Sequence, residues 1–95
     1  MKANRILNIA NIFKSIGHPV RLQILRVIHE HETLSVKNIQ ELLNVAQPVI
    51  SLHLAILKKQ KIINSNKKGK QSLYYINNKS VVQIIQILYY DNRLE

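Results

Sequence analysis

Residues 35–57 of the chain, SVKNIQELLNVAQPVISLHLAIL, contain two helical patterns separated by a short polar interruption. Apolar residues recur at helical spacing at Val36, Ile39, Leu42 and Leu43 before the interruption, and at Ile50, Leu54 and Leu57 after it. Ser35 is a suitable cap for the first helix, and Asn44 tolerates a left-handed turn. A short helix, a tight turn over residues 44–47 and a second helix from Pro48 predict a helix-turn-helix.

Helical patterns also occur on both sides of this unit. One helix is expected to end before Gly17, the next to run from Pro19 to near His31, and the last to begin at Ser80. The main stripes are Ile6, Ile9, Ile12, Phe13 and Ile16; Val20, Ile24, Val27 and Ile28; and Val81, Ile84, Ile85 and Leu88. The last stripe is wider than one small domain needs to cover, which predicts a second surface packed against it.

The period changes to two between the fourth and fifth helices, which predicts a β-hairpin. Ile62 and Ile63 open one strand, residues 67–70 supply the turn, and Leu73 to Ile76 form the second strand. The sequence therefore predicts one domain over residues 1–95, mainly α with a small β-hairpin (α+β), in the order α-α-α-α-β-β-α.

The composition limits the possible functions. The chain has 95 residues, with 14 Lys and Arg against 5 Asp and Glu, so its net charge of +9 favours a polyanionic partner such as nucleic acid. The absence of Cys excludes disulfides and thiolate metal sites. No signal-peptide core and no membrane-spanning run are found, so a cytoplasmic protein is expected. No nucleophile–base pair, phosphate loop or paired carboxylates indicate an enzyme.

The positive charge is concentrated in the second half of the chain. Between Glu41 and Asp91 there is no acidic residue, but there are seven lysines: Lys58, Lys59, Lys61, Lys67, Lys68, Lys70 and Lys79. For any single one of these lysines, a solvated surface position without a partner is as good an interpretation as a contact with nucleic acid. Three lysines around Gly69, at a hairpin tip beside a helix-turn-helix, instead predict a cationic arm for a phosphate backbone or a minor groove.

Four motifs in order resemble the ArsR/SmtB winged helix-turn-helix repressors. They are GHPVRLQIL at residues 17–25, LSV at 34–36, QPVISLHL at 47–54, and KGK at 68–70 with Tyr74-Tyr75. The resemblance covers roughly residues 10–90. It implies a homodimeric transcriptional repressor that places a recognition helix in the major groove of double-stranded DNA and the hairpin, or wing, on neighbouring DNA.

The resemblance also implies which residues contact DNA. The expected contacts are Lys37, Gln47, Pro48, Ser51, Leu52, His53, Lys58, Lys67, Lys68 and Lys70. Gln47 suits adenine, Ser51 a base or phosphate, and the wing lysines suit phosphates, whereas Pro48 restricts the local backbone.

Four positions leave alternatives open. Leu52 departs from the family's polar or basic residue and either touches a thymine methyl or packs. His53 is either a half-buried structural residue or a DNA contact. Arg21 is expected to anchor the fold through backbone carbonyls or Glu41 rather than to reach DNA. Ala46 replaces a family Ser that caps the recognition helix, a loss of about 0.5 to 2 kcal/mol unless another group accepts those amides.

The family dimerises through its first and last helices, so the resemblance implies an interface on these two apolar stripes. The expected interface residues are Ile6, Ile9, Phe13, Val81, Ile84, Ile85 and Leu88.

Many members of the family release DNA when they bind metal, through cysteines near the third helix or Asp/His/His/Glu-type ligands along the last helix. This chain has no Cys, and its last helix offers Lys79, Val81 and Asp91 without a histidine. The segment His29-Glu30-His31-Glu32 is interpreted as a solvated helix end, because its two histidines point to different sides of a helix. No metal or other cofactor is therefore expected, and whether a small-molecule effector exists, and which, is unknown from the sequence.

The main alternative function is a winged-helix protein-interaction module, in which the apolar stripes bind another protein and the charge aids solubility. The lysine-rich hairpin argues against it.

Overall fold

The computed structural model of the chain describes residues 3–91, so residues 1–2 and 92–95 of the predicted domain lie outside the described residues. It confirms the predicted element order. The elements are α1 (Ala3–Ile16), α2 (Pro19–His31), α3 (Val36–Leu43), α4 (Gln47–Lys59), β1 (Ile63–Lys68), β2 (Gln71–Ile76) and α5 (Lys79–Tyr90). Within the described part of the chain, no helix is long and apolar enough to cross a membrane.

Local polar groups explain where the central helices begin and end. The Ser35 side chain accepts a hydrogen bond from the Asn38 amide at 3.1 Å, and the Asn38 side chain accepts from the Ser35 amide, which together form a capping box. Asn44 ends α3 in the left-handed region with φ 54°, as predicted. At α5, the Asn78 side chain accepts from the Val81 amide at 3.1 Å.

The hairpin is longer and its turn tighter than the sequence predicted. Lys68 pairs with Gln71, so only Gly69 and Lys70 form the turn, and Lys67 and Lys68 belong to β1. Gly69 has φ 65°, and a glycine with positive φ at the first position is typical of a two-residue hairpin turn. The strands are longer because backbone hydrogen bonds pair polar residues as well as apolar ones. A pattern of alternating apolar residues therefore underestimates the length of the strands.

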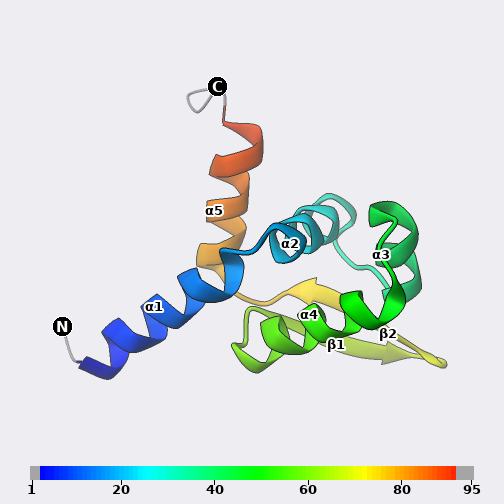
Figure 1. Cartoon of the computed structure of the whole chain (residues 1–95), viewed down its shortest axis with the longest axis horizontal. Coiled ribbons are helices and arrows are strands. Elements are labelled where there is room, and N and C mark those ends of the chain that lie inside the picture. Colours follow the sequence, from blue (N-terminus) through cyan, green and yellow to red (C-terminus); the bar gives the residue numbers. More distant parts are fainter. Residues whose placement is uncertain (1–2, 92–95) are drawn as a thin grey trace.

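One apolar core joins all five helices to the base of the hairpin. Its fully buried members include Ile24, Leu25 and Ile28 of α2, with Ile39, Ile50, Leu57, Val81 and Ile85 of other helices and Ile62 just before β1. Figure 1 shows α2, α3 and α4 packed together beside the hairpin, while the outer ends of α1 and α5 project away from this body. The hairpin tip lies toward the α3–α4 end of the molecule, away from α1.

Candidate nucleic-acid interface

Helix α4 has one buried face and one exposed face. Ile50, Leu54 and Leu57 are buried as predicted, because the spacing of 4 and 3 residues places them on one side of the helix. The opposite face carries Pro48, Leu52 and Ala55, all exposed, with the partly exposed Ser51 at its side, and Gln47 is exposed at the N-terminal end of the helix. Packing against the core thus fixes the orientation of α4 and leaves this second face toward solvent.

Two polar side chains at the start of α4 hold each other. The Gln47 Nε2 donates to the Ser51 Oγ at 2.7 Å, so the amide orientation of Gln47 is fixed one turn along the helix. The helix begins at Gln47 rather than at Pro48, and Ala46 supplies no side-chain cap, as its residue type predicted. The first turn of α4 therefore lacks the side-chain acceptor that stabilises α3.

The hairpin places lysines beside this helix. Lys67, Lys68 and Lys70 are exposed, the first two on β1 and the third in the turn. The Lys58 Nζ donates to the Ser65 Oγ at 3.0 Å, which links the last turn of α4 to β1. This link holds the base of the wing against the end of α4, and the contact of the wing lysines with DNA stays a prediction.

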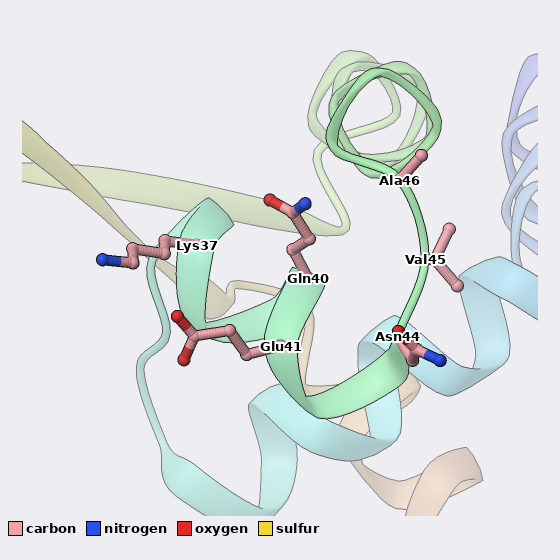
Figure 2. Close-up of a pocket in the computed structure, with 6 residues that line it drawn as sticks. All are labelled: Lys37, Gln40, Glu41, Asn44, Val45 and Ala46. Atoms are coloured by element: carbon pink, nitrogen blue, oxygen red, sulfur yellow. The ribbon is translucent and has the colours of Figure 1, made fainter.

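Lys37 lies at another edge of the helix-turn-helix. Figure 2 shows it projecting from α3 beside Glu41, near a pocket that Gln40, Asn44, Val45 and Ala46 also line. Glu41 is one helical turn from Lys37, so the carboxylate offsets part of the lysine's attraction for a phosphate. The pocket has no nucleophile beside a base, and it marks the corner between α3 and α4 rather than a catalytic site.

His53 needs a correction, because the structure buries its side chain. It is only 8% exposed, its ring lies 4.5 Å from that of His18 between centroids, and its Nδ1 is 3.1 Å from Arg21 Nη1. The Arg21 Nε donates to the Ser15 carbonyl, which confirms that Arg21 anchors the fold through a backbone carbonyl. The interpretation of His53 as a structural residue is therefore favoured over a DNA contact.

This cluster joins three helices and was not predicted from the sequence. Arg21 comes from α2, Ser15 from α1 and His53 from α4, while His18 precedes α2 and accepts from the Val20 amide at 3.1 Å. The one hint of this cluster in the sequence was that His18 and Arg21 belong to the same motif. Nothing in the spacing indicated that Arg21 contacts His53, 32 residues away.

The His53 cluster predicts a loss of stability in mild acid. Guanidinium groups only donate, so the His53 Nδ1 must accept from Arg21 and stay unprotonated in the folded state. Burial lowers the pKa of His53, and the charges of His18 and Arg21 lower it further. Because the unfolded pKa is about 6.5, the folded protein binds fewer protons below that pH, and the free energy of unfolding falls as pH drops from about 6.5 toward the folded pKa.

Urea unfolding at several pH values tests this effect. One titrating group contributes at most about 1.4 kcal/mol per pH unit. His53→Gln keeps an acceptor for Arg21 without a titrating ring, so its stability is expected to fall less steeply between pH 6.5 and 5. Equal slopes in the two proteins would show that His53 does not cause the decline.

Helices α1 and α5 carry a large exposed apolar surface. On α1, Ile6, Leu7 and Phe13 are 51%, 62% and 57% exposed, and on α5, Leu88 is 51% exposed. Ile9 and Ile87 are also exposed, and Ile84 is partly buried against the core. A monomeric protein rarely exposes so many large apolar side chains, so these two helices are candidates for an interface.

Two of the expected interface residues need a correction. Val81 and Ile85 are fully buried in the core of their own chain, so they have no surface to offer to a partner. Leu7 and Ile87 were not among the expected interface residues, although both are exposed large apolar residues on the same helices.

The histidines at the end of α2 contact other protein groups. The His29 Nε2 lies 3.0 Å from the Gln86 Oε1, and the His31 Nδ1 lies 2.9 Å from the Val27 carbonyl oxygen. Nearby, the Tyr90 hydroxyl donates to Glu30 at 2.9 Å, which ties the end of α5 to α2. Among residues 3–91, no three His, Cys, Asp or Glu side chains come together in a way that could hold a metal ion.

Comparison with known proteins agrees with this architecture. The profile of a family described as a helix-turn-helix domain matches residues 16–66. An uncharacterized HTH-type transcriptional regulator of Methanocaldococcus jannaschii is 42% identical over 79 residues, 83% of this chain and 89% of that protein. The transcriptional repressor PagR of Bacillus anthracis is 34% identical over 79 residues, 83% of this chain and 79% of that protein.

Solved structures give the same result for the fold. The crystal structure of PagR matches with a TM-score of 0.86 at 30% identity, over 92% of this chain and 99% of that chain. The homodimeric winged helix-turn-helix domain Mb0332 of Mycobacterium bovis has the same fold, with a TM-score of 0.86 at 22% identity over 98% of this chain and 87% of that chain. The chain belongs to the ArsR/SmtB family of DNA-binding winged helix-turn-helix transcriptional regulators.

Proposed function

We propose that the protein is a sequence-specific transcriptional repressor that binds double-stranded DNA in the cytoplasm as a homodimer, without a metal ligand. The observation that carries this proposal is the exposed face of α4, which lies beside a lysine-rich wing in a stretch without acidic residues from 42 to 90. The relative PagR is a transcriptional repressor.

The expected DNA contacts divide into two classes. Gln47 and Ser51 lie where a recognition helix reaches base edges, and they supply sequence discrimination. Lys37, Lys58, Lys67, Lys68 and Lys70 supply phosphate contacts, which raise affinity with little sequence information. Phosphates also offer acceptors to the uncapped start of α4, where the helix dipole favours negative charge.

A dimer would double this surface. The exposed apolar residues of α1 and α5 lie on the helices that project away from the body that carries the wing (Figure 1). Burying them between two copies leaves both recognition helices free, and two-fold symmetry then suits half-sites about 34 Å apart. The Mycobacterium bovis domain with this fold is itself homodimeric.

Binding of the full chain to a pool of random duplexes, followed by a titration on the selected duplex, tests the proposal. We expect a selected sequence with two-fold symmetry, salt-dependent affinity and tighter binding to it than to random DNA by about 10³-fold or more.

Added micromolar zinc, copper or arsenite should leave the affinity unchanged, provided that the protein stays soluble. A protein-interaction module without DNA binding would enrich no duplex, and release of DNA by zinc would contradict the metal-independent mechanism.

A further inference from the structure

The outermost arc of the recognition helix is unusually apolar for a surface that faces DNA. Leu52 is 59% exposed, and Pro48 and Ala55, one turn before and after it, are also exposed. Each of the three lies on the face opposite the buried Ile50, Leu54 and Leu57. Val49, 38% exposed, lies beside Leu52 on the same helix, and the exposed Lys59 follows on the same face two turns later.

The same surface lacks the side chain best suited to guanine. Arginine is the commonest residue in bidentate contacts to guanine, but the chain has no arginine between Arg26 and Arg93. The lysines of α4 lie in its last turn, whereas the N-terminal part of a recognition helix is the part that meets base edges. That part of α4 offers one amide, one hydroxyl and apolar groups.

The side-chain amide of Gln47 has the hydrogen-bonding groups that adenine requires. One N–H of the Gln47 side chain is donated to Ser51, which leaves the other N–H and the Oε1 free on a side chain of fixed orientation. One donor and one acceptor side by side match N7 and the N6 amino group of adenine. Ser51 acts here as a positioning residue for Gln47.

We propose that Leu52 contacts the C5-methyl groups of thymine in the major groove, so that α4 selects A·T base pairs through Leu52 together with Gln47. Apolar side chains are the usual partners of that methyl, which is the only apolar group that a base pair presents in the major groove. This inference rests on the proposed function, and the absence of acidic residues from 42 to 90, with lysines at the end of α4 and in the wing, favours DNA over a protein as the group that covers Leu52.

Deoxyuridine substitution tests the contact, because it removes only the methyl group of thymine. In the duplex selected by the wild-type protein, we expect A·T pairs at the central positions of each half-site. Replacing the contacted thymine by deoxyuridine should weaken wild-type binding about fourfold per half-site, the effect of losing one buried methyl. Leu52→Ala should bind the thymine duplex more weakly and show no further loss on the deoxyuridine duplex.

Leu42→Ala is the matched control, since Leu42 is an exposed leucine on α3, at 49%. It should keep the full deoxyuridine effect. If no deoxyuridine weakens wild-type binding, or if the effect survives in Leu52→Ala, the inference is wrong while the proposed function stands. If Leu52→Ala and the wild type bind the thymine duplex with equal affinity, Leu52 does not contact DNA, and the inference is also wrong; the exposed apolar arc would then fit a protein partner. Failure to bind any duplex would overturn the proposed function and this inference together.

Discussion

Replacing Lys67, Lys68 and Lys70 together by alanine is expected to flatten the plot of log affinity against log salt by up to about 5 units per dimer. Each phosphate contact contributes about 0.9 to this slope, and two wings carry three such lysines each. All three side chains are exposed, so their loss leaves the core intact. Specific and random duplexes should weaken together, because phosphates carry no sequence information.

Two further variants separate charge from sequence recognition. Lys14→Ala combined with Lys79→Ala removes two exposed lysines from α1 and α5 and should leave the salt slope nearly unchanged. Gln47→Ala should reduce discrimination between the selected and random duplexes by roughly 1 to 3 kcal/mol at an almost constant slope. The slopes are measured by titration at about 50 to 200 mM salt. If the triple variant keeps the wild-type slope, this division of roles is wrong.

Residues that act through local geometry were predictable from the sequence. Ser35 caps α3, Asn44 takes the left-handed turn, and Gly69 takes a positive φ, each because its own side chain and backbone preferences suffice. The buried face of α4 followed in the same way from the spacing of Ile50, Leu54 and Leu57. The helix-turn-helix and the wing, and with them most of the candidate DNA surface, could therefore be placed in advance.

Residues whose position depends on a distant partner were not predictable. His53 lies at the edge of the inward arc of α4, and only the fold brings Arg21 and His18 against it. The wide stripe of α5 has the same ambiguity, because periodicity marks an apolar arc but not which part of it faces the chain's own core. The structure divides that arc between Ile85, which is buried, and Leu88, which is half exposed.

This division predicts opposite fates for two substitutions three residues apart on α5. Ile85→Asp should unfold the protomer, because it removes a fully buried side chain and places a carboxylate in the core. Truncation of such a side chain alone costs about 2 to 5 kcal/mol, a large part of the 5 to 15 kcal/mol that stabilises a typical domain. Circular dichroism should show little helix in this variant at 25 °C.

Leu88→Asp should leave the protomer folded and separate the dimer, because Leu88 is 51% exposed in the single chain. A central interface residue contributes about 2 kcal/mol or more, and two-fold symmetry counts it twice, so the dimer dissociation constant should rise about a thousandfold. Sedimentation at tens of micromolar protein and near-physiological salt measures this change. Gln23→Asp, which adds the same charge at an exposed position of α2, should remain dimeric. A wild-type monomer, or a dimeric Leu88→Asp protein, would remove α1 and α5 from the proposed interface and with it the two-fold recognition of DNA.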